Sequence, residues 1–181
     1  MRLMIIALAL AAPAVAFADT CPDVPERGAR YDALMKGVRT APNENAARQI
    51  SNELWEIWAN APDTRAQALL DEGMQRRAGF DFDGAIIAFD ALVEYCPDYA
   101  EGYNQRAFVN FIRGEYALAL DDLDLALERD PVHIAALSGR ALTLMGMGQM
   151  DDGQDQLRAA LELNPWLPER NMLVEPAGDD I

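Results

Sequence analysis

The chain has 181 residues, of which 51% are hydrophobic and 25% are charged, and its formal net charge is −15 at pH 7. This acidic balance argues against a nucleic-acid partner, because binding a polyanion needs a basic face. It also disfavours an anionic membrane surface. The hydrophobic content argues against a wholly disordered chain, so we expect a soluble folded domain.

Residues 1–18 have the features of a secretory signal peptide. Arg2 gives a positive start, residues 3–15 form an apolar run, and residues 16–18 (AFA) suit a signal peptidase site. We expect cleavage after Ala18 and a periplasmic or secreted mature chain. A membrane anchor is the alternative, but the run is shorter than the ~20 residues that span a bilayer. No later run is long enough, so no membrane insertion is expected after cleavage.

Two cysteines, Cys21 and Cys96, follow the leader. Export to an oxidising compartment favours a disulfide between them, and two unpaired thiols are the alternative. Neither cysteine belongs to a Cys-x-x-Cys sequence, so a redox-active pair has little support.

Apolar spacing and helix-breaking residues predict an all-α chain built from helical pairs. Residues 19–26 are rich in proline and are predicted to be extended, and Asn43 is a candidate N-cap. The tail after residue 166 holds one short helical turn near residues 169–174. The predicted helices cover residues 27–40, 44–60, 66–78, 83–96, 100–113, 116–129, 134–146 and 150–163.

A repeated spacing organises these pairs. Prolines end the units at intervals of 35, 34 and 34 residues, a glycine marks the turn within each unit, and a small residue follows it. Small residues let two helices approach closely. The prolines are Pro62, Pro97, Pro131 and Pro165, the turn glycines are Gly79, Gly114 and Gly148, and the small residues are Ala85, Ala119 and Gly153. One extra residue between glycine and small residue in the first unit accounts for the interval of 35.

The best-preserved unit reads A-E-G-Y-x-x-x-A … G-E-Y-x-x-A-L-x-D-L-x-x-A-L-x-x-D-P at residues 100–131. This pattern resembles the tetratricopeptide repeat (TPR) family. The resemblance implies a right-handed α-solenoid of helix-turn-helix repeats, with a concave face lined by the first helix of each pair. The expected division is a signal peptide at 1–18, an N-terminal segment with a degenerate helical pair at 19–65, repeats at 66–99, 100–133 and 134–167, and a short C-terminal tail at 168–181.

The family's usual binding surface is the concave groove, which implies a protein or peptide partner and no cofactor. Some members bind terminal carboxylates through lysine, arginine and asparagine side chains, and here only Arg77 and Asn104 offer that chemistry. An apolar groove for an extended or helical segment is therefore expected. Core packing between repeats is the alternative for Phe108, Phe111 and Met145. The groove positions implied by the resemblance are Leu70, Met74, Arg77, Asn104, Phe108, Phe111, Ser138, Leu142 and Met145.

Other conspicuous residues have structural explanations. Arg106 and Arg140 occupy equivalent positions, where the stem can pack while the head pairs with a carboxylate. The acids of the second helices are expected to face water and favour the helix dipole, and no calcium-loop pattern is present, so no metal site is predicted. His133, the only histidine, is expected to be solvated. It lacks catalytic partners, so we predict no enzyme. These acids are Asp121, Asp122, Asp124, Asp151, Asp152 and Asp155.

Tryptophans mark the two ends of the predicted solenoid. Trp55 and Trp58 are expected to anchor the N-terminal pair onto residues 66–78, and Trp166 to cover the last repeat incompletely. The leading function is a non-catalytic periplasmic interaction module, an adaptor or scaffold that holds a peptide or protein in its groove. The alternative is a structural or weakly self-associating envelope protein that acts through its terminal repeat surface.

Overall fold

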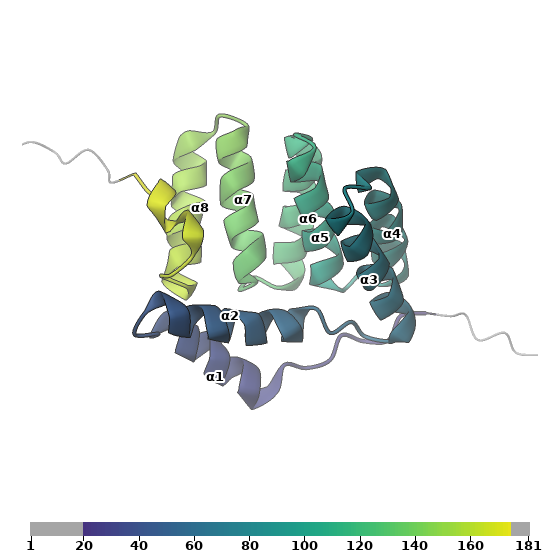
Figure 1. Cartoon of the computed structure of the whole chain (residues 1–181), viewed down its shortest axis with the longest axis horizontal. Coiled ribbons are helices and arrows are strands. Elements are labelled where there is room, and N and C mark those ends of the chain that lie inside the picture. Colours follow the sequence, from purple (N-terminus) through teal and green to yellow (C-terminus); the bar gives the residue numbers. More distant parts are fainter. Residues whose placement is uncertain (1–19, 175–181) are drawn as a thin grey trace, which may run out of the picture.

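The computed structural model describes residues 20–174, which form eight α-helices and one 3-10 helix and contain no strand. The predicted signal peptide and its cleavage site lie outside the described residues. The all-α class is confirmed (Figure 1). The helices are α1 (Gly28–Arg39), α2 (Glu44–Trp58), α3 (Thr64–Ala78), α4 (Phe82–Tyr95), α5 (Ala100–Ile112), α6 (Tyr116–Arg129), α7 (Ile134–Gly146) and α8 (Met150–Leu163), followed by the 3-10 helix η1 (Pro168–Met172).

Local side-chain chemistry sets several helix starts. The side chain of Asn43 accepts a hydrogen bond from the backbone N–H of Ala46, as predicted, and so caps α2. Asp63 and Asp81 do the same for α3 and α4. Each such cap satisfies an N–H that the helix itself leaves unpaired.

The six helices from α3 to α8 form three stacked pairs. Each helix packs against its neighbour in the chain, and α5 also contacts α3 and α7. Small residues permit the close approach: a Cβ atom on Gly73 of α3 would overlap the ring of Phe89 in α4. Phe89 is fully buried, so this contact lies at the centre of the first pair.

The turn in the first pair differs from the sequence prediction by one residue. Gly114 and Gly148 have positive φ angles of 77° and 80°, and the residue in that conformation in the first pair is Phe80, with φ 62°. Gly79 has φ −84° instead. Phe80 lies five residues before Ala85, the same spacing as in the other two units. The extra residue of the first unit therefore lies before this turn, between Pro62 and Phe80, and its predicted place after the turn was wrong.

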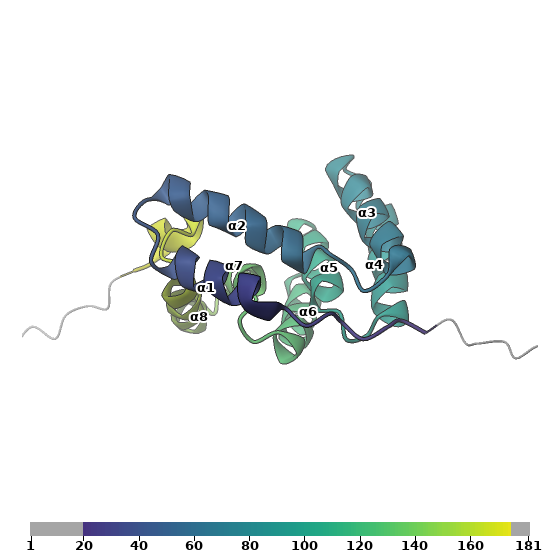
Figure 2. The ribbon, with the colours of Figure 1, turned by 90° about the horizontal axis from the view of Figure 1, so that it is seen from below.

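The N-terminal pair does not extend the stack as a fourth repeat. It lies across one edge of the solenoid, under the turns that join successive repeats (Figures 1 and 2). Helix α1 packs on α2 and reaches α8, at the far end of the stack. None of the helices within residues 20–174 is long and apolar enough to cross a membrane.

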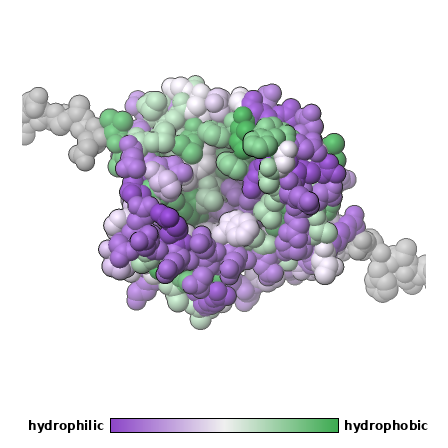
Figure 3. Space-filling model, viewed as in Figure 1, coloured by the Kyte–Doolittle hydropathy of each residue, from purple (hydrophilic) through white to green (hydrophobic). Residues whose placement is uncertain are grey.

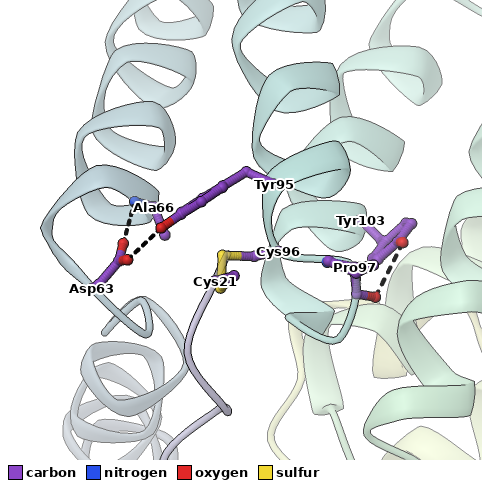
Figure 4. Close-up of a disulfide and its surroundings, with 7 residues drawn as sticks. All are labelled: Cys21, Asp63, Ala66, Tyr95, Cys96, Pro97 and Tyr103. Atoms are coloured by element: carbon purple, nitrogen blue, oxygen red, sulfur yellow. Dashed lines mark hydrogen bonds between the residues drawn. A yellow bond between two sulfur atoms is a disulfide. The ribbon is translucent and has the colours of Figure 1, made fainter. Parts of the chain in front are cut away.

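The two turns that join successive repeats, and a third turn that follows α8, all contact the N-terminal segment. At the first, Cys21 forms a disulfide with Cys96, with the Cα atoms 5.1 Å apart (Figure 4), and this is the pairing favoured from the sequence. The Tyr99 hydroxyl there donates to the carbonyl of Trp58 at 2.5 Å, and burial raises the pKa of Tyr99. At the third, the indole N–H of Trp166 donates to the carbonyl of Ala41 at 3.0 Å.

At the middle turn, between α6 and α7, the N-terminal pair is held through Trp58 of α2. Its ring stacks on His133 at 4.5 Å between centroids, and its N–H donates to Asp130 at 3.0 Å. The prediction that Trp58 anchors onto residues 66–78 was wrong, because α2 crosses the stack instead of lying alongside α3. Asp130 also pairs with Arg27 at 2.7 Å, so this turn is tied to both ends of the N-terminal pair.

Candidate functional site

A groove of about 350 Å³ opens on the face formed by the first helices of the repeats. The face seen in Figure 3 is hollowed above α2, with hydrophobic side chains inside the hollow. Helices α5 and α7 supply most of the lining, and α2 and the start of η1 also contribute residues to it. The lining residues include Trp55, Arg77, Asn104, Gln105, Phe108, Phe111, Ser138, Leu142, Leu167, Pro168 and Glu169.

Six of the nine predicted groove residues line this space, namely Arg77, Asn104, Phe108, Phe111, Ser138 and Leu142. Phe108 is 48% exposed, so it belongs to the surface and not to the core between repeats. Three of these six side chains are apolar and three are polar. The groove becomes mainly apolar through further lining residues, which include Trp55, Ala107, Leu123, Ala135 and Leu167.

The other three predicted positions lie outside the groove. Leu70 is fully buried in the core of the first repeat and cannot touch a partner, so its assignment was wrong. Met74 is partly buried against the same core. Met145 lies close to Gly153 of α8, within the last helical pair. Leu70 and Met74 thus belong to the core around Phe89, and Met145 packs against α8.

Several groove residues come from outside the repeats and were not predicted. Trp55 belongs to α2 and is 44% exposed, whereas Trp58 on the same helix is buried. Leu167, Pro168 and Glu169 belong to the segment after α8. A repeat pattern cannot indicate them, because the crossing of α2 and the return of the C-terminal segment depend on tertiary contacts.

Arg77 is held in place at one end of the groove. Its guanidinium lies 4.8 Å from the centre of the Phe108 ring and donates a hydrogen bond to Gln105. Burial lowers the pKa of Arg77, and the negative charge of Glu101 opposes that shift. The group nevertheless stays cationic at neutral pH, since an arginine pKa lies far above 7.

A buried polar cluster lies next to the groove. The carboxylate of Glu101 accepts from Asn104 at 3.0 Å, from Gln105, and from the ring of His133 at 2.8 Å. The other ring nitrogen of His133 accepts the backbone N–H of Ala136 at 3.3 Å. In this pattern Nδ1 accepts and Nε2 donates, so both ring nitrogens are engaged within the protein.

His133 was expected to be solvated, and the structure corrects that expectation. Its exposed fraction is 1%, as is that of Glu101. The ring is enclosed because α2 crosses the turn and lays Trp58 over it. The only histidine of the chain therefore serves packing and helix capping.

The equivalent arginines have the structural role that the sequence suggested. Arg106 pairs with Asp122 and, at 2.7 Å, with Asp90, and Arg140 pairs with Asp124 at 2.6 Å. Asp122 is buried, so the expectation that this acid faces water was wrong. Within residues 20–174, no group of three or more potential metal-ligating side chains is close enough to hold an ion.

A larger cavity, of about 700 Å³, lies between the N-terminal segment and the first connecting turn. Its cations already have partners: Arg27 pairs with Asp130, Arg30 with Glu53 at 3.0 Å, and Arg129 donates to backbone carbonyls. The cavity therefore offers little unsatisfied chemistry, and the smaller groove is the better candidate site.

Known proteins with similar sequences carry the same repeats. A TPR repeat-containing protein of Rhizobium etli is 30% identical over 151 residues, which cover 82% of this chain and 67% of the relative. The chain belongs to the tetratricopeptide repeat family. The tetratricopeptide repeat protein 36 homolog of Nematostella vectensis is 35% identical over 72 residues, 40% of each chain. No protein-family model matches the chain.

Solved TPR structures share the fold. The first TPR of Spaghetti (RPAP3) aligns with a TM-score of 0.59 at 23% identity and covers 60% of this chain and 87% of its own. The crystal structure of the MamA protein aligns with a TM-score of 0.53 at 20% identity, covering 81% and 79%. These likenesses confirm the predicted α-solenoid.

Proposed function

We propose that this TPR protein is a non-catalytic interaction module that holds a peptide or protein segment in its concave groove. The observation that carries the proposal is Phe108, a large aromatic side chain left half exposed in a mainly apolar groove. Apolar pockets with a few convergent polar groups are the usual binding sites of proteins.

Related structures support a peptide or protein partner. The first TPR of RPAP3 is bound to the HSP90 peptide SRMEEVD, and the TPR2B domain of yeast Sti1 is in a complex with an Hsp70 segment. Because only Arg77 and Asn104 match the polar chemistry that some TPR proteins use for terminal carboxylates, apolar contacts carry more of the binding here.

The proposal places the protein in the periplasm or outside the cell, as an adaptor or scaffold. The leader at residues 1–18 supports this location, and a disulfide between Cys21 and Cys96 fits an oxidising compartment. Cell fractionation with N-terminal sequencing tests it: we expect a periplasmic protein that begins at Asp19, and a cytoplasmic protein that retains Met1 would refute it.

A photocrosslinking amino acid at position 108 tests the groove. We expect it to capture a partner in intact cells, whereas the same amino acid at Ile87, which is 70% exposed on α4, captures none. The Phe108→Ala variant should lose co-purification of that partner, and Ile87→Ala should keep it. If the Phe108→Ala and Ile87→Ala variants co-purify equal amounts of the partner, the groove is ruled out as the binding surface.

Self-association through the end of the solenoid is the second candidate. Met172 and Val174 are exposed there, next to α8. Size-exclusion chromatography with light scattering separates the two ideas, because a monomer at all concentrations excludes a role for the terminal surface in self-association.

A further inference from the structure

One carboxylate oxygen of the groove has no hydrogen-bond partner. Oε2 of Glu169 is buried, yet no donor within residues 20–174 reaches it. Glu169 is at the start of η1 and lines the groove together with Trp55 and Pro168. Removing a carboxylate oxygen from water is costly unless a donor replaces the lost hydrogen bonds. The chain's own donors therefore leave the negative charge of Glu169 incompletely compensated, and the residue as a whole is half-buried, so a partner's positive charge can approach its carboxylate.

The surroundings of Glu169 favour a cationic group of the partner. The indole of Trp55 lines the same groove and is 44% exposed. A carboxylate and an exposed aromatic ring that line one groove can together hold a cationic side chain, the carboxylate by an ion pair and the ring by cation–π attraction. The net charge of −15 attracts a cationic partner over a longer range.

The arginines of the protein nearest to this end are already engaged. Arg170 pairs with Glu44 at 3.0 Å and donates to the carbonyls of Trp166 and Leu167. Arg77 donates to Gln105 and lies over Phe108. A partner that satisfies Glu169 must therefore bring its own positive charge.

The size of the groove limits the ligand to a short segment. Its volume of about 350 Å³ is near the lower end of the roughly 300–1,000 Å³ that is common for small-molecule sites. Trp55 of α2 and residues 167–169 border it, and the space between them suits a short stretch of a ligand. One large apolar side chain and one neighbouring charged side chain use this space well.

We infer that the partner binds through a short basic motif. Its apolar side chain contacts Phe108, Phe111 and Leu142, and a lysine or arginine next to it pairs with the carboxylate of Glu169 in the groove that Trp55 also lines. This inference rests on the proposed function, because it specifies the occupant of the same groove.

A display library of random octapeptides, selected on the purified protein, tests the inference. We expect enrichment of peptides that combine a large apolar residue with a lysine or arginine. For a selected peptide, Glu169→Gln should weaken binding about tenfold, the usual cost of removing a charged hydrogen-bond partner. Glu162→Gln removes an exposed acid of α8 outside the groove and should leave the affinity unchanged.

The outcomes separate the two proposals. If the selected peptides lack basic residues, or if Glu169→Gln binds them as tightly as the wild type, the basic motif is refuted while the groove function stands. If no peptide is selected, or if Phe108→Ala binds the selected peptides unchanged, both proposals fail. A lysine-to-methionine change in the peptide should cost as much as Glu169→Gln, and the two changes together should cost no more than either alone.

Discussion

Phe80 combines two unusual properties at a single residue. Its backbone is left-handed, with φ 62°, and its side chain is 82% exposed. The same turn position holds Gly114 and Gly148 in the other repeats, where the absence of a Cβ makes this conformation inexpensive. The protein thus keeps an aromatic side chain in a strained and solvated position where a glycine would fit better.

Replacing Phe80 by glycine should stabilise the protein. Relief of the left-handed conformation is expected to raise the free energy of unfolding by about 1 kcal/mol. Phe80→Ala is the matched control, because it removes the ring but keeps the strained backbone. Urea unfolding of both variants measures the difference, and equal midpoints would show that Phe80 carries no backbone strain.

At the scale of the helix, α2 carries two tryptophans with different roles. Trp58 is buried between Tyr31 and His133, and Trp55, three residues earlier, lines the groove. One side of the helix thus ties the N-terminal pair to the solenoid, and the other side contributes to the candidate site.

These roles predict that replacing Trp58 lowers stability, whereas replacing Trp55 weakens ligand binding. Trp58→Ala should lower the free energy of unfolding by about 4 kcal/mol, the usual range for a buried aromatic residue. Trp55→Ala should change it by less than about 0.5 kcal/mol, as is common at exposed positions, but should weaken binding of a groove ligand. Chemical denaturation and a binding titration measure both, and a stability loss from Trp55→Ala equal to that from Trp58→Ala would contradict this division.

The sequence predicted the elements well because helix signals are local. The predicted helix 116–129 coincides with α6, and 100–113 extends α5 by one residue. The placement of α1 and α2 could not be predicted, because their contacts join residues far apart in the chain, such as Trp58 with Asp130. No periodicity indicates which surface a separate helical pair will cover.

The same distinction explains the candidate site. Phe108 and Leu142 follow from repeat spacing, which fixes the face of the first helix. Leu70 was misassigned because core and groove positions lie within one helical turn of each other. Glu169 was missed because nothing in the sequence around it indicates that it returns to the groove.

At the scale of the whole molecule, the disulfide joins residues 75 positions apart. Reduction should lower the free energy of unfolding by about 4 kcal/mol, as loop-closure entropy predicts for a loop of this length. Guanidinium unfolding with and without a reducing agent measures this loss. The double variant Cys21→Ser with Cys96→Ser should be insensitive to the reductant, and an oxidised protein with the same stability as this variant would refute the prediction.

Acid should weaken the fold through its capping aspartates. The backbone N–H of Ala66 and then the hydroxyl of Tyr95 lower the pKa of Asp63 below 3.8 (Figure 4). As the pH falls, the carboxylate of Asp63 is therefore protonated in the unfolded chain before it is protonated in the folded protein. Its stabilisation of the fold is complete at neutral pH and is lost as the pH falls through the lowered pKa.

Asp63→Asn tests this pH dependence, because asparagine still caps a helix but does not titrate. We expect the wild type to be more stable than the variant at pH 7 and the difference to shrink at pH 3. Urea unfolding at both values measures it, and a difference that is independent of pH would contradict the assignment.

The crossing of α1 and α2 also bears on how the chain is made. A repeat array can ordinarily add or lose units at its end, since each unit contacts only its neighbours. Here the carbonyl of Ala41 binds the indole of Trp166, and Glu44 binds Arg170, which lies 126 residues later in the chain. Helices α1 and α2 are synthesised before the repeats but complete their docking only after α8 has formed, and contacts of such range slow folding. The number of repeats is therefore fixed at three in this protein. In a shorter or longer array, the turn after the last repeat would lie elsewhere and could not contact the N-terminal helices.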